Sequence, residues 1–145
     1  MKVLRTYYIF LFSAVVIGQE KEPIKYEDLY ERNGLIYASD QDSSFNGTVD
    51  ENWPTGINKL SYTYKNGKPE SKWSDWFNNG QPKEEVEYSD GIKNGLHKQW
   101  YKNGQQKFER TYKNGIHDGK WTEWYENGQP MVEGNFLDGK PDGAW

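Results

Sequence analysis

The sequence predicts an all-β fold: an elongated, single-layer antiparallel meander of stacked β-hairpins. The first observation is a repeat with a period of 24 residues, clearest in the even spacing of Trp76, Trp100 and Trp124. The second is a set of turn dipeptides, since eight of the 15 glycines follow Asn and four follow Asp. The third is that the segments between these turns are too short for helices of ordinary length. A fixed period predicts one supersecondary unit, copied along the chain and packed on its neighbours.

One unit shows how the pattern predicts structure. The run from Leu96 to Tyr101 predicts a first strand, and Asn103-Gly104 predicts the turn that ends it. Residues 107–112 then alternate apolar and polar side chains, as a half-buried strand does, before a second turn at Asn114-Gly115. Asn-Gly and Asp-Gly favour type I′ turns, which need positive φ at both central residues. Each unit is therefore expected to be a hairpin with a tight turn into the next unit.

The chain divides into a signal, a leader and a repeat domain. Residues 1–18 are expected to be a signal peptide, and the charged segment 19–27 a flexible leader. The repeat domain then covers 28–145, and its first unit is degenerate, with a polar loop at 38–44 inside an imperfect hairpin. The expected units are 28–46, 47–70, 71–94, 95–118 and 119–142, with a partial one at 143–145.

The first residues have the pattern of a secretory signal. A basic start precedes an apolar stretch of about 11 residues from Tyr7 to Ile17, and Gly18 is small enough for a cleavage site. A membrane anchor is the alternative, but the stretch is shorter than the roughly 20 residues that span a bilayer. We expect cleavage near Gly18, no transmembrane span in the mature form, and export to the periplasm, the cell surface or the medium.

Composition excludes several classes of partner and site. The mature chain of about 127 residues would carry a net charge near −6, which argues against binding nucleic acid or an anionic membrane surface. It has no cysteine, so no disulfide framework can stabilise it. Stability must come from packing, and the many Trp and Tyr side chains are the expected packing material.

The two histidines do not predict a catalytic or metal site. His97 occupies the column of Trp73 and Trp121 and is expected to pack there, whereas His117 aligns with Lys93 in a variable turn. A zinc site needs three or four converging ligands, and neither histidine lies near a distinctive nucleophile turn. We expect no catalytic residue, no cofactor and no metal.

One acidic column recurs at Glu85, Glu109 and Glu133. Stacked carboxylates could face a cation or a basic partner, but catalysis by two carboxylates needs different environments, and repetition predicts similar ones. The structural interpretation is a solvated face with basic counter-ions. The expected counter-ions are Lys83, Lys107 and Arg110.

The aromatic side chains are the stronger candidates for binding. Trp73 and Trp76 lie three residues apart, as do Trp121 and Trp124, so in a regular strand they point to opposite faces. One layer cannot bury both faces, which leaves some rings exposed to a partner; packing against neighbouring repeats is the alternative. The candidate aromatic residues are Trp73, Trp76, Trp100, Tyr101, Trp121, Trp124 and Tyr125.

A family resemblance follows from these motifs. The run Gly119-Lys120-Trp121-x-x-Trp124-Tyr125-x-Asn127-Gly128-Gln129 resembles a MORN-type repeat, closest to the bacterial variant found in proteins named YwqK-family antitoxins. The lead-in from Asp28 to Tyr37 is similar to that of the same group. The resemblance implies a twisted single sheet of hairpins and, through the group's name, neutralisation of a toxin.

Two functions are carried forward from the sequence. The first is an exported, non-enzymatic module that binds a protein, with immunity to a toxin as one version. The alternative is a carbohydrate or cell-wall binding module that uses the aromatic side chains. A hydrolase using the acidic column has the least support. Gly143-Ala144-Trp145 matches the start of a further strand, so we expect this edge either to continue in a longer array or to mediate self-association.

Overall fold

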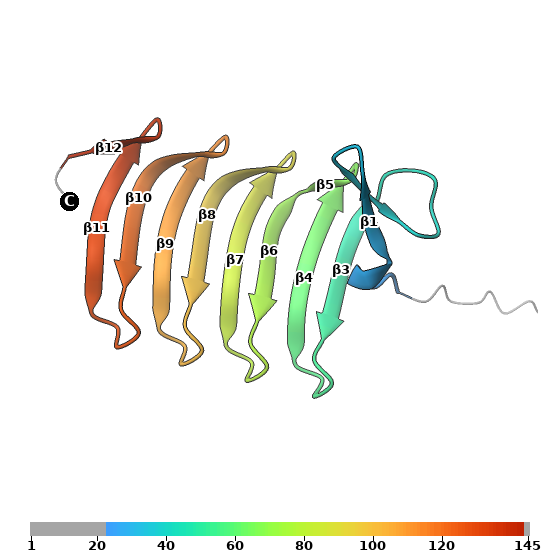
Figure 1. The fold of residues 1–145 in the computed structure, drawn as a ribbon, viewed down its shortest axis with the longest axis horizontal. Helices are drawn as coiled ribbons and strands as arrows, with labels where there is room; N and C mark the ends of the chain where they lie inside the picture. Colours follow the sequence, from blue (N-terminus) through green and yellow to red (C-terminus); the bar gives the residue numbers. More distant parts are fainter. Residues whose placement is uncertain (1–22, 144–145) are drawn as a thin grey trace, which may run out of the picture.

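The computed structural model describes residues 23–143, which form two antiparallel sheets (Figure 1). The large sheet has the strand order β12-β11-β10-β9-β8-β7-β6-β4-β3, with β5 paired to β4. The strands are β1 Leu29–Arg32, β2 Leu35–Ala38, β3 Gly47–Asn52, β4 Asn58–Lys65, β5 Lys68–Pro69, β6 Ser71–Trp76, β7 Pro82–Ser89, β8 Ile92–Trp100, β9 Gln106–Lys113, β10 Ile116–Trp124, β11 Pro130–Leu137 and β12 Lys140–Asp142. The predicted meander of hairpins is confirmed. The predicted signal at 1–18 and the edge residue Trp145 lie outside the described residues.

The turns at the upper edge of Figure 1 have the predicted type I′ geometry. In the turn between β9 and β10, Asn114 has a φ of 50° and Gly115 a φ of 81°. The other three upper turns also have positive φ at both residues. They are Asn66-Gly67, Asp90-Gly91 and Asp138-Gly139. In three of these four turns the glycine N–H donates to a carbonyl just after the preceding upper turn, as Gly115 does to Lys93 at 2.8 Å.

The turns at the lower edge are different, and the type I′ prediction is wrong for them. In the turn from Phe77 to Gln81 only Gly80 has positive φ, at 84°, and its N–H donates to the Phe77 carbonyl at 2.9 Å. This is the pattern of a type I turn followed by a left-handed glycine. The Asn79 side chain accepts a bond from Gln81 N–H at 3.1 Å and donates to the Lys102 carbonyl of the next turn at 3.0 Å. In the lower turns Asn therefore contributes the hydrogen bonds of its side-chain amide, and not a positive φ.

A third group of glycines lies inside strands. Gly95 has a φ of 118° where the β7–β8 register shifts between Val86 and Tyr88. A Cβ on Gly95 would lie 1.9 Å from Oε2 of Glu87. In the preceding unit Ser71 takes this position with a φ of 61°, and the chain there divides into β5 and β6. A bulge thus recurs once per unit, and Ser71 occupies a conformation that glycine adopts more easily.

The first residue of each lower turn is aromatic and reaches toward the next unit. The indole N–H of Trp53 donates to the Trp76 carbonyl at 3.3 Å, and the hydroxyl of Tyr101 donates to the Trp124 carbonyl at 3.0 Å. Phe77 stands at the equivalent position between them but has no donor. Two different side chains therefore make the same lateral bond, and Phe77 does not.

The segment 28–46 covers the end of the large sheet. The sequence had predicted that this segment would be an imperfect hairpin inside the sheet. β1 and β2 pair with each other around Asn33-Gly34, and the Ile36 N–H donates to the Gly67 carbonyl at 2.8 Å. Between this hairpin and the sheet lies the main apolar core, in the part of the molecule where two layers meet. The buried members of this core are Ala38, Phe45, Val49, Leu60 and Tyr64.

The described part of the segment predicted as a flexible leader, residues 23–27, contacts the sheet. Ile24 packs against the core. Tyr26 begins a 3₁₀ turn, η1 (Tyr26–Asp28), lies edge-on to Tyr62 with ring centroids 5.6 Å apart, and donates its N–H to Glu51 at 2.9 Å. The apolar and aromatic side chains in this charged segment explain why it docks.

Replacing Ser71 by Gly is expected to raise the free energy of unfolding by about 1 kcal/mol. Holding a non-glycine residue at positive φ costs about 1–3 kcal/mol, and the extra freedom of Gly in the unfolded chain offsets about 0.4–1 kcal/mol of that gain. Urea unfolding followed by tryptophan fluorescence measures the change. The matched variant Gly95→Ser should lower stability, and an unchanged midpoint for Ser71→Gly would contradict the assignment of strain to Ser71.

Phe77→Tyr should add the missing lateral hydrogen bond, to the Trp100 carbonyl, and stabilise the protein by about 0.5–1.5 kcal/mol, the usual net contribution of such a bond. Tyr101→Phe should remove the bond that exists and lower stability by a similar amount. The same urea titration tests both. If neither substitution changes the free energy of unfolding, the aromatic residues that begin the lower turns add no lateral stabilisation.

Candidate binding face

The register of the strands assigns side chains to two faces, because residues paired across strands point the same way. The face that we call the aromatic face has one central row. This row runs Val49, Tyr62, Trp73, Val86, His97, Arg110, Trp121, Gly134. The opposite face, here the polar face, has a row of hydroxyl and charged side chains. It runs Asp50, Ser61, Ser74, Glu85, Lys98, Glu109, Thr122, Glu133.

Rings on the aromatic face contact one another from strand to strand. Trp73 stacks on Tyr62 with centroids 4.3 Å apart and contacts Tyr88 at 5.0 Å. Further along the sheet, the Arg110 guanidinium lies 4.0 Å from the ring centroids of both Phe108 and Trp121. Most of these rings are half-buried, so they stabilise the sheet laterally and still present a surface.

Polar groups on the aromatic face are paired diagonally between neighbouring strands. The Tyr62 hydroxyl donates to Asp75 at 2.7 Å, and Nε2 of His97 lies 2.7 Å from Glu84. The bond from His97 holds the pKa of Glu84 below its usual range, whereas burial raises the pKa of Asp75 despite the bond from Tyr62. The third diagonal pair is Arg110 with Glu123.

His117 also lies on this face, in β10, and not in a turn as the sequence predicted. Its ring is 4.3 Å from Tyr112 and 5.3 Å from Phe136 between centroids. Burial, reinforced by the charge of Arg110, lowers the pKa of His117. His97 is buried against Phe108, as its column predicted. Among residues 23–143, no three His, Asp or Glu side chains are placed to hold a metal ion.

The acidic column lies on the polar face, but its counter-ions differ from the expected ones. Lys83 and Lys107 lie on the aromatic side of the sheet, away from the acidic column. Arg110 is also on that side, where it pairs with Glu123. The lysines that pair with the column are on the preceding strand of each hairpin. The pairs are Lys72–Glu85 at 3.0 Å, Lys98–Glu109 at 3.0 Å and Lys120–Glu133 at 3.2 Å. The column is thus neutralised by neighbouring lysines.

The structure separates the candidate aromatic residues into different surfaces. Trp73 and Trp121 lie on the aromatic face. Trp76, Trp100 and Trp124 belong to the polar face, at the ends of their strands, as their spacing predicted. Tyr101 and Tyr125 begin lower turns, and Tyr125 is 50% exposed.

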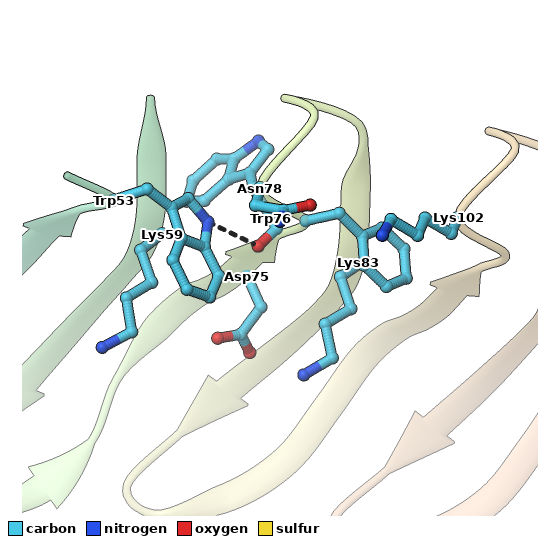
Figure 2. Close-up of a pocket in the computed structure, with 8 residues that line it drawn as sticks. Trp53, Lys59, Asp75, Trp76, Asn78, Lys83 and Lys102 are labelled. Carbon is cyan, nitrogen blue, oxygen red and sulfur yellow. Dashed lines mark hydrogen bonds between the residues drawn. The ribbon is translucent and has the colours of Figure 1, made fainter. Parts of the chain in front are cut away.

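A pocket of about 260 Å³ lies on the aromatic side of the first two lower turns (Figure 2). Its lining includes Trp53, Phe77 and Asp75. Figure 2 shows Lys59, Asp75 and Lys83 projecting from the same side of the ribbon, with Lys102 reaching in from the third lower turn. The lining residues are Trp53, Lys59, Asp75, Trp76, Phe77, Asn78, Lys83 and Lys102.

The sequence interpretation missed this pocket, although the period contained the signal for it. Trp53 is one residue out of register with the column of Trp76, Trp100 and Trp124. It belongs instead to a second aromatic column, shared with Phe77, Tyr101 and Tyr125. A lysine follows six residues after three of these four rings. Those lysines are Lys59, Lys83 and Lys107, and Met131 replaces lysine in the last unit.

Comparison with known proteins gives one family match. No curated protein matches the chain. Among the described residues, no helix is long and apolar enough to cross a membrane. The model of the MORN repeat variant matches residues 69–90, 93–114 and 118–138. Three consecutive segments of the chain are thus similar to the MORN repeat variant, and MORN repeats are in general non-catalytic modules that bind proteins or membranes.

Proposed function

We propose that this chain is a non-enzymatic repeat module that binds a protein partner through its aromatic face. The observation that carries the proposal is the row of half-buried rings and paired charges on one side of a single-layer sheet. In the part of the chain that the structure describes, strands β7 to β11 pack on their neighbours in the sheet and on no second layer. Partly exposed aromatic and Arg side chains are also the residue types enriched in protein interfaces.

The finer version of this function is neutralisation of a toxin outside the cytoplasm. The resemblance to the antitoxin group supports the toxin as a partner, and the pattern of residues 1–18 supports export. The toxin and the export are separate proposals, since a secreted module can bind any surface protein.

A carbohydrate ligand is the second candidate, and the pocket favours it. Trp53 and Phe77 supply apolar rings to its lining, and Asp75 and Asn78 supply polar groups. A sugar ring needs this combination of a flat apolar contact and a few convergent hydrogen-bonding groups. The two functions differ in the molecule that the chain binds, a protein in one and a carbohydrate in the other, and a binding experiment identifies which.

Photo-crosslinking from each face tests the proposed function. Benzoyl-phenylalanine replaces Tyr88 on the aromatic face or Tyr125 in the last lower turn, and Lys72 or Lys120 on the polar face, in the full chain expressed in its native host. We expect a protein adduct of one discrete mass from the first two positions and none from the others. The isolated partner should then bind Tyr125→Ala at least about fivefold more weakly than wild type, a loss typical of a contributing interface residue. Adducts from the polar face, or retention of a polysaccharide alone, would overturn the proposal.

A further inference from the structure

The lower edge of the aromatic face carries a series of lysines, most of which form no salt bridge within the described part of the chain. The carboxylates of the adjacent row are hydrogen-bonded to other side chains: Glu51 to Lys59, Asp75 to Tyr62, Glu84 to His97 and Glu123 to Arg110. Lys83 lies near Asp75 and Glu84, and its charge favours their ionised forms. Three lysines at this edge form no salt bridge with the residues that the structure describes. They are Lys83, Lys102 and Lys107.

These lysines alternate with aromatic rings. Nζ of Lys107 lies 5.7 Å from the Tyr101 ring centroid, and Nζ of Lys59 lies at the same distance from Trp53. Lys83 and Lys102 line the same pocket as Trp53 and Phe77. The edge therefore offers an apolar wall and a cation in each of three consecutive units, a combination that suits an acidic side chain on an apolar backbone.

The spacing of the units selects the conformation of such a ligand. Equivalent residues of neighbouring hairpins are two strands apart, or about 9.4–9.8 Å. Three residues of polyproline II rise about 9.3 Å and return the side chain to the same side of the helix. A β-strand covers a similar length in three residues but turns the third side chain to the opposite face. A polyproline II segment thus matches the lysine column, and a β-strand does not.

We propose that this edge binds a proline-rich acidic segment of the partner, in the polyproline II conformation, with an acidic residue at every third position. The inference rests on the proposed function, because it names the chemistry of the protein partner. The chain's net charge of −4 does not oppose it, since charges beyond about 8 Å are largely screened at physiological ionic strength. The nearby lysines then determine the local potential.

Fluorescence anisotropy with synthetic peptides tests the inference on the full chain. The probe is labelled (Pro-Pro-Glu)₄, and the comparison peptide has the same composition with its four Glu residues consecutive. We expect the spaced peptide to bind at least about fivefold more tightly, and its binding to weaken with added salt. Equal binding of the two peptides, or binding unchanged by salt, would overturn the proposed spacing.

Substitutions then locate the binding edge. Lys83→Gln with Lys107→Gln should weaken binding of (Pro-Pro-Glu)₄ at least about fivefold, because each exposed ion pair contributes modestly. The matched control, Lys72→Gln with Lys120→Gln, removes two lysines from the polar face and should leave binding unchanged. All four lysines are exposed, so circular dichroism should show folded variants. Equal losses in both double variants would refute this edge as the site, whereas crosslinking from the aromatic face would still support the proposed function.

Discussion

The large sheet of this protein depends on lateral packing, because most of its length has no second layer. A side chain on β7 or β9 finds its neighbours only on the adjoining strands. The rings of the aromatic face, the Lys–Glu pairs of the polar face and the stacked turns are three forms of this contact. Stability is then expected to be the sum of contacts between neighbouring units, as in other repeat proteins. The same geometry leaves each face open to a partner.

The 24-residue period predicted the strands and their order because it reports a strong physical constraint. Positive φ at both residues of a type I′ turn restricts those positions to Asn, Asp and Gly, so the upper turns can be predicted from the sequence. The same dipeptide, however, has three roles in the structure. Asn114-Gly115 forms a type I′ turn, Asn79-Gly80 supplies a side-chain amide to a type I turn, and Asn94-Gly95 makes a bulge. Local sequence does not separate these roles, because each requires a left-handed glycine.

The parts that were not predicted depend on contacts between distant residues. The hairpin of β1 and β2 covers the sheet because Phe45 and Ala38 bury against Val49 and Tyr64, and no periodic signal marks that docking. The lysine partners of the acidic column depend on the register between strands, which shifts at each bulge. The pocket at Trp53 was not predicted for a simpler reason, since the evident column of Trp76, Trp100 and Trp124 lies one residue away from the column that contains Trp53.

Burial is uneven along the sheet, and this gives the account its most direct test. The core lies at β3 and β4, and among the described residues Phe108 is the last apolar side chain along the chain that is buried. Native-state hydrogen exchange of the full chain measures local opening for each amide. If lateral contacts alone stabilise the far units, the hydrogen-bonded amides of β4 should exchange most slowly, and protection should fall from β7 to β11. Uniform protection across all strands would show one cooperative unit and contradict the account.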